Sequence, residues 1–281
     1  MKKLLLLIII LTTLINTGCW DMIEINERIY PYSVGVDLNK EGNTLYKVTF
    51  SYPNILALGK SPTQKQTVYV ISTAGNSIFD ATHELTTRLQ YPIYNKHLKV
   101  LVISEEVARN PKYVRELADA INRDFVMNKS VNLIVVPSTA EELLLAKLKA
   151  ERQQVVEGTL YSLLINRQDA TNFTPRTITE FVADNDNRNV SVVPLAHMTG
   201  DDIEIGGGGL FKNYGLVGYL SHEENRALAI LNGEVKQDGI ETDFNGARLS
   251  VLGTSFKSKR KLLDSENLKI QINVRIEGQV H

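Results

Sequence analysis

The residue with the clearest chemistry in this sequence is Cys19, the only cysteine among 281 residues. It follows Lys2 and Lys3, an unbroken apolar run over residues 4–11, and Gly18 directly before it. A charged start, a short apolar stretch and small residues before a cysteine are typical of a bacterial lipoprotein export signal. Cysteine is required there because its sulfur atom takes a thioether-linked diacylglycerol before cleavage. We therefore expect a signal peptide over residues 1–18 and a mature chain that is anchored to a membrane through Cys19.

Two other interpretations of this N-terminus stay open. Asn16 lies three residues before the cysteine, where a lipoprotein signal usually carries Leu or another aliphatic residue. An ordinary cleaved signal and an uncleaved anchor are the alternatives. The apolar segment is shorter than the roughly 20 residues that a spanning helix needs, because Thr12, Thr13 and Asn16 interrupt it. We expect it to direct export and not to span the membrane.

The histidines form no recognisable metal-binding or catalytic pattern. His83-Glu84 resembles the beginning of the His-Glu-x-x-His zinc motif, but residue 87 is Thr. We expect ordinary structural roles for this histidine and for the remaining candidates, which are His97, Lys99, His197 and His222.

Other short motifs also have structural interpretations. Glycines 206–209 are not followed by the Gly-Lys-Ser/Thr of a phosphate loop, so we predict a flexible linker. The carboxylates of Asp184, Asp186, Asp201 and Asp202 lack the spacing of a calcium loop and are expected to form a solvated acidic loop. The basic residues 257–261 could contact anionic lipid, but a solvated hairpin loop explains them better. We predict no catalytic residue, no metal site and no cofactor, and the sequence assigns no ligand-binding residue.

Charge and cysteine content exclude several classes of protein. The chain has 31 basic and 32 acidic residues, and loss of Lys2 and Lys3 with the signal leaves 29 against 32, a net charge of −3. No strongly basic face is implied, so we expect no nucleic-acid partner. With Cys19 acylated, no thiol remains for a disulfide or a cysteine metal site.

Hydrophobic periodicity predicts alternating strands and helices up to about residue 194. Residues 45–50 alternate with a period of two, and residues 39–43 supply turn chemistry before them, so we expect a hairpin with a strand over 32–37. Asn110 and Pro111 begin a helix as its cap and first residue. Further strands are expected at 67–72, 97–103, 131–136 and 190–194. Further helices are expected at 76–90, at 138–148 behind a Ser138-Thr139-Ala140-Glu141 capping box, and over 151–184, where Thr174-Pro175 marks a second helix start.

The C-terminal third has a different character. We expect short strands at 210–212 and 216–220, a helix at 223–232, a strand at 234–237, and two strands at 248–256 and 268–277. In the last strand, apolar Ile270, Ile272, Val274 and Ile276 alternate with polar residues, and such a strand needs a covering layer. The predicted class is α+β and multidomain, with mixed, mostly antiparallel sheets and packed helices. The expected domains are an N-terminal α/β domain at 19–204, a small second domain at 205–242 and an incomplete third domain at 243–281.

Several segments resemble one known family. Gly18-Cys19-Trp20-Asp21, then Glu24-Ile25-Asn26 and Val34-Gly35-Val36-Asp37, are similar to the opening of the Ger(x)C family, the lipoprotein subunits of spore germinant receptors. Later segments agree in order: Tyr46-Lys47-Val48-Thr49, the run from His97 to Glu106, Arg123-Asp124, Gly209-Leu210-Phe211-Lys212 and Leu216-Val217-Gly218-Tyr219-Leu220.

The resemblance implies a three-domain protein without catalytic activity, on the outer face of the inner spore membrane of an endospore-forming bacterium. It would act with two integral-membrane receptor subunits in the response to nutrients. Lipidation carries over to Cys19, and no other residue role does. Relatives continue well past the strand that ends near Glu277, which is why the third domain is expected to be incomplete.

The sequence therefore leaves two classes of function open. The first is an interaction protein, a lipid-anchored subunit of a germinant receptor. The second is a solute-binding lipoprotein that captures a small nutrient itself, with two lobes closing around the joint at Gly206. An exported hydrolase is disfavoured because no nucleophile, base and orienting group can be assembled from the sequence.

Overall fold

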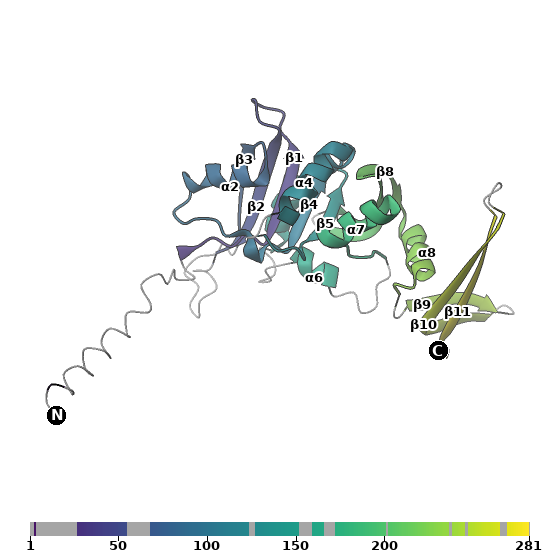
Figure 1. Ribbon diagram of the computed structural model, residues 1–281. Helices are drawn as coiled ribbons and strands as arrows, with labels where there is room; N and C mark the ends of the chain where they lie inside the picture. Colours follow the sequence, from purple (N-terminus) through teal and green to yellow (C-terminus); the bar gives the residue numbers. More distant parts are fainter. Residues whose placement is uncertain are drawn as a thin grey trace.

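A computed structural model describes Lys3 and residues 27–54, 68–123, 127–151, 159–165, 172–200, 202–235, 238–244, 247–264 and 269–280. Cys19 and the predicted signal lie outside these residues. The described chain forms an eight-stranded mixed sheet with the order β3-β2-β1-β4-β5-β6-β7-β8 and a three-stranded antiparallel sheet with the order β11-β10-β9 (Figure 1). Most strand pairs are antiparallel and helices pack on the sheets, which confirms the predicted α+β class.

One edge of the large sheet is an antiparallel meander, and it confirms the predicted hairpin. The period-two alternation of side chains places Tyr46, Val48 and Phe50 in the core, where they are at most 2% exposed. Its strands pair in sequence order and are β1 (Ser33–Leu38), β2 (Tyr46–Pro53) and β3 (Val68–Gly75).

The centre of the large sheet is parallel. Strands β4 (Val100–Ser104) and β5 (Asn132–Val136) continue from β1, and every residue in both is buried. Helices cover both faces of this part, which is why the sequence shows continuous apolar runs here. The strand predicted from residue 97 begins three residues later, because Asn95–His97 form a short 3-10 helix.

Two helical layers enclose this sheet. One face is covered by α2 (Ile78–Thr86), α3 (Glu105–Ala108), α4 (Pro111–Arg123) and α7 (Ile178–Arg188). The other face is covered by α5 (Ala140–Glu151) and α6 (Thr159–Ile165). The predicted helix start at Thr174-Pro175 was wrong. Helix α7 begins at Ile178, because Thr177 caps it and exchanges capping-box hydrogen bonds with Glu180.

The first turn of α5 also differs from the prediction. The Glu142 amide donates to Thr139 Oγ1 at 3.2 Å, so Thr139 and not Ser138 is the cap. The amides of Ala140 and Glu141 instead donate to the two carboxylate oxygens of Asp37 at 2.7 and 3.0 Å. Asp37 is only 4% exposed, and this burial raises the pKa of its carboxyl group although both bonds lower it. The end of β1 thereby fixes the beginning of a helix about a hundred residues later.

Substitution Asp37→Ala is expected to lower the free energy of unfolding by about 2–3 kcal/mol, because two amide groups at the beginning of α5 lose their acceptors. Chemical denaturation of the full chain measures this value. Thr139→Ala removes the other cap of the same helix and should cost only about 1 kcal/mol. Equal losses in the two variants would contradict the special role of Asp37.

Glu141 connects α5 to the meander. Its carboxylate accepts hydrogen bonds from Lys47 Nζ at 2.5 Å and from Ser72 Oγ at 2.7 Å. Burial by itself would raise the pKa of Glu141, but the bonds from Lys47 and Ser72 outweigh it and hold this pKa below its ordinary value of 4.5.

A depressed pKa stabilises the folded chain above pH 4.5 and loses this contribution as the pH falls through the folded-state pKa. Relative to Glu141→Gln, the wild-type chain should therefore lose up to about 0.5 kcal/mol between pH 6 and pH 3, since Lys47 is partly exposed and solvent screens the pair. Urea unfolding at several pH values measures the difference. Glu84→Gln, a substitution on the exposed side of α2, controls for loss of one charge.

The other edge of the large sheet is formed by β6 (Val190–Thr199), β7 (Asp202–Lys212) and β8 (Gly215–Leu220). Glycines 206–209 lie in the middle of β7 and are buried, so the predicted flexible linker was wrong. Three residues of β6, from Pro194 to Ala196, face four of β7, from Ile205 to Gly208, which makes a bulge. Gly207 takes the extra position with φ +68°, and its amide donates to the carbonyl oxygen of Asn172 at 2.8 Å.

Helix α8 (His222–Asn232) follows β8 and lies between the large and the small sheet (Figure 1). The small sheet contains β9 (Asp238–Phe244), β10 (Ala247–Asp264) and β11 (Lys269–Val280). The strand predicted at 234–237 is not found at residues 234–235, and residues 236–237 lie outside the described part of the chain. Strand β9, which was not predicted, begins at Asp238. The predicted basic loop at 257–261 is part of β10. Ala229, Val235 and Phe256 form a small core between α8 and β10. The division into domains at residues 204 and 242 stays a prediction.

Candidate functional site

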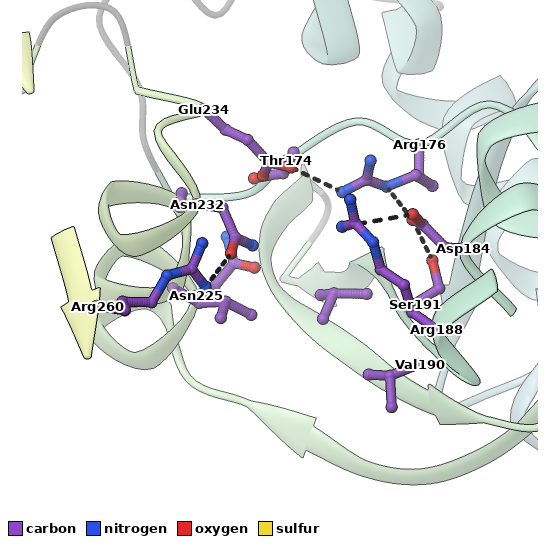
Figure 2. A pocket seen from close by; sticks show the side chains of 13 residues that line it. Thr174, Arg176, Asp184, Arg188, Val190, Ser191, Asn225, Asn232, Glu234 and Arg260 are labelled. Atoms are coloured by element: carbon purple, nitrogen blue, oxygen red, sulfur yellow. Dashed lines mark hydrogen bonds and ion pairs between the residues drawn. The ribbon is translucent and has the colours of Figure 1, made fainter. Parts of the chain in front are cut away.

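A polar cavity of about 250 Å³ lies where α7 and β6 face α8 (Figure 2). Its wall combines three arginines with two carboxylates, so the formal charge of its lining is +1. Neutral polar side chains and a strip of apolar side chains complete the wall. The charged residues are Arg176, Arg188, Arg260, Asp184 and Glu234.

Arg176 is the central cation of this cavity. Its side chain is 16% exposed, and its Nε lies 3.5 Å from Asp184 Oδ2 while its Nη2 lies 3.2 Å from Glu234 Oε1. Asp184 is on α7, whereas Glu234 lies two residues after the end of α8. The backbone of Arg176 is also fixed, since its carbonyl accepts from the Leu133 amide of β5 at 2.9 Å. One guanidinium group therefore ties α8 to the large sheet.

The other two arginines are less engaged. Arg188 is 77% exposed and reaches Asp184 Oδ1 only at 4.0 Å. Arg260 projects from β10, and its polar contact within the described residues is Asn232 Oδ1 at 3.5 Å. Figure 2 shows Arg188 on the α7 side and Arg260 on the α8 side of the cavity. Both guanidinium groups therefore have donors to offer.

The buried part of the wall contains donors without good acceptors. Asn225 is 1% exposed, and its Nδ2 has no hydrogen-bond partner. The Nε of Arg176 is buried as well and has only the 3.5 Å ion contact with Asp184. Buried donors are normally satisfied, so an excess of donors at one place is a sign of a missing acceptor.

A second cluster of polar side chains was not predicted from the sequence, because its members lie in separate segments of the chain. Glu204 stands between two imidazoles, with His197 Nε2 at 3.5 Å from Oε2 and His222 Nε2 at 3.6 Å from Oε1. Pairing of β6 with β7 places His197 opposite Glu204, and the beginning of α8 adds His222. No three His, Cys, Asp or Glu side chains in the described ranges are arranged to hold a metal ion.

The remaining sequence candidates have structural surroundings. His83 is exposed on α2, and His97 packs edge-on against the Tyr30 ring with centroids 5.1 Å apart. Asp184 and Asp186 lie on α7 and not in the predicted acidic loop, because the helix continues to Arg188. Asp186 accepts from the Tyr214 hydroxyl at 2.7 Å, and burial together with this carboxylate raises the pKa of Tyr214 to about 12. Asp202 begins β7, while Asp201 lies outside the described residues.

Comparison with known families identifies the chain. Residues 21–198 match the spore germination protein N-terminal domain, and residues 206–281 match the C-terminal domain described as spore germination B3/GerAC like. The chain belongs to the GerAC family of spore germination proteins. This confirms the resemblance to the Ger(x)C family that the sequence segments indicated. The two matches meet between residues 198 and 206, at the turn from β6 into β7.

Relatives in this family are distant but cover most of the chain. The putative spore germination protein YfkR of Bacillus subtilis (strain 168) is 24% identical over 96% of this chain and 72% of its own length. Spore germination protein B3 of the same organism is 21% identical over 93% of this chain and 70% of its own length. The crystal structure of the GerBC protein matches with a TM-score of 0.50 and 17% identity, covering 93% of this chain and 74% of that chain. The GerBC likeness shows a shared fold.

Within the described ranges, no helix combines the length and the apolar character needed to cross a membrane.

Proposed function

We propose that this chain is a lipid-anchored, extracytoplasmic subunit of a nutrient germinant receptor and has no catalytic activity of its own. The observation that carries this proposal is the match of both the N-terminal and the C-terminal part of the chain to spore germination domains. The export signal predicted over residues 1–18, directly before Cys19, supports anchoring through acyl chains, because a cysteine behind a short apolar leader is the acceptor that such processing needs.

The proposed location is the outer face of the inner spore membrane, and the proposed partners are integral-membrane subunits of the same receptor. A chain anchored by its N-terminus stays close to the bilayer, so its local concentration near membrane partners is high without a large interface. This arrangement would let the folded part contact the outer surfaces of those subunits.

Deletion of the gene in its spore-forming host tests the proposal. Spores without the chain should germinate normally with some nutrients and fail with the nutrient class that the receptor serves, and a plasmid copy should restore the response. Affinity purification from detergent-solubilised spore membranes should recover integral-membrane proteins together with the chain. Normal germination of the deletion strain with every nutrient class, and recovery of the chain alone, would contradict the receptor role.

A second candidate function is direct capture of a small nutrient, as in a solute-binding lipoprotein. The cavity beside Arg176 is the observation that favours it. Closure of two lobes around Gly206 does not fit the structure, since this residue lies inside a buried strand. Ligand capture would therefore use the cavity between α7 and α8 as it stands.

A further inference from the structure

We propose that the cavity between α7, β6 and α8 is a binding site for a small organic molecule that carries one carboxylate group. This proposal rests on the second candidate function, direct capture of a nutrient, and names its ligand class. It does not depend on the receptor role. A binding measurement on the purified chain can therefore fail or succeed independently of any germination experiment.

The first step of the argument is the distribution of charge. Arg176 lies between Asp184 and Glu234, so these two carboxylates balance its positive charge. Arg188 and Arg260 stand on opposite sides of the cavity, and neither has a carboxylate closer than 4.0 Å among the described residues (Figure 2). A guanidinium group binds a carboxylate through two parallel N–H···O bonds, which makes an arginine with free donors a carboxylate receptor.

The second step is the shortage of acceptors. Asn225 Nδ2 and Arg176 Nε are buried donors without a hydrogen-bond acceptor in the described residues that surround them. Together with Arg188 and Arg260, they give this wall several N–H donors that lack a close acceptor. An oxyanion supplies acceptors only, so it complements this excess, whereas an amine would add more donors.

The third step limits the charge and size of the ligand. Asp184 and Glu234 are part of the same wall, so a doubly charged phosphate would meet more repulsion than a carboxylate with one charge. The volume of about 250 Å³ lies below the usual range for drug-sized ligands, which begins near roughly 300 Å³. The apolar strip of Val190, Val192, Leu228 and Ala229 suits a short hydrocarbon part.

Ligand-observed NMR titration of the full chain in detergent micelles tests this site. Butyrate and benzoate are the carboxylate probes, and inorganic phosphate, butylamine and butanol are the comparison probes. We expect saturable binding of the carboxylates with a Kd on the order of 1 mM or below, and binding of each comparison probe at least about tenfold weaker. Absence of saturable carboxylate binding, or equal binding of phosphate, would overturn the proposal.

Paired variants locate the binding. Arg260→Gln should weaken carboxylate binding by about tenfold or more, because it removes a charged donor pair from the wall while keeping a polar side chain at this position. Arg188→Gln should have a similar effect from the opposite side. Arg123→Gln, an exposed substitution on α4 outside the cavity, serves as the matched control and should leave binding unchanged. Circular dichroism verifies that all three variants are folded, and unchanged binding in both cavity variants would place the carboxylate elsewhere.

Discussion

Replacing Cys19 with alanine, behind an ordinarily cleaved secretory leader in place of residues 1–18, is expected to move the chain from the membrane to the soluble fraction. The physical reason is the loss of the acyl chains, each of which contributes about 0.8 kcal/mol per buried methylene group. Two or more chains give stable anchoring, so the membrane-bound fraction should fall from nearly all of the protein to nearly none. Immunoblots of membrane and soluble fractions measure this change, and germination assays of the same spores report its consequence.

The native leader provides the control for this experiment. Asn16→Leu places an aliphatic residue three positions before Cys19, as a lipoprotein signal usually has, and should maintain or increase the membrane-bound fraction. Mass spectrometry of the N-terminal peptide should find the acyl mass on Cys19 in this variant and in the wild-type chain. An unmodified sulfur atom in the wild-type chain, or a fully membrane-bound and active alanine variant, would refute anchoring through this residue.

Gly207→Val in β7 should lower the free energy of unfolding by about 3–5 kcal/mol. Two effects combine here. Gly207 has φ +68°, a conformation that costs a β-branched residue most, and a Cβ atom would lie 2.4 Å from the carbonyl oxygen of Leu220. That oxygen belongs to the backbone of β8, so a side-chain rotation cannot relieve the contact. Thermal and urea denaturation of the full chain measure the loss.

Gly218→Val is the matched control, because Gly218 lies in the neighbouring strand β8 and a Cβ atom there would have no heavy atom within 4 Å. It should change the free energy of unfolding by no more than about 0.5 kcal/mol. If the two variants were equally stable, the bulge at Gly207 would not be needed for the fold.

Local patterns predicted most of the elements around the centre of the large sheet. Val114, Leu117, Ala118 and Ile121 form one stripe of α4, and all four are buried as their spacing predicts. The apolar run of β5 is buried at every position. These predictions succeeded because periodicity within a few residues determines which face of an element meets the core.

The candidate cavity could not be predicted in the same way. Arg176 and Glu234 are 58 residues apart, and their contact exists only because α8 packs beside the large sheet. The length of β10 was missed for a related reason, since the outer part of that strand has exposed residues and therefore no apolar alternation. The cavity lining thus depends on the path of the chain and not on a motif.

The sequence by itself determined most of the order of strands and helices, because this depends on residues that are neighbours along the chain. For the same reason it predicts the acylation of Cys19, which lies outside the described residues. Only the tertiary structure decided the role of glycines 206–209. Four glycines have the same weak local preference in a linker and in a bulge. The difference comes from His222, Leu220, Val192 and Val135, which lie so close to the four glycines that an added Cβ atom would force a neighbouring group to shift. The same physical reason holds for Arg176 and His222, whose partners are set by packing between segments that are distant in the sequence.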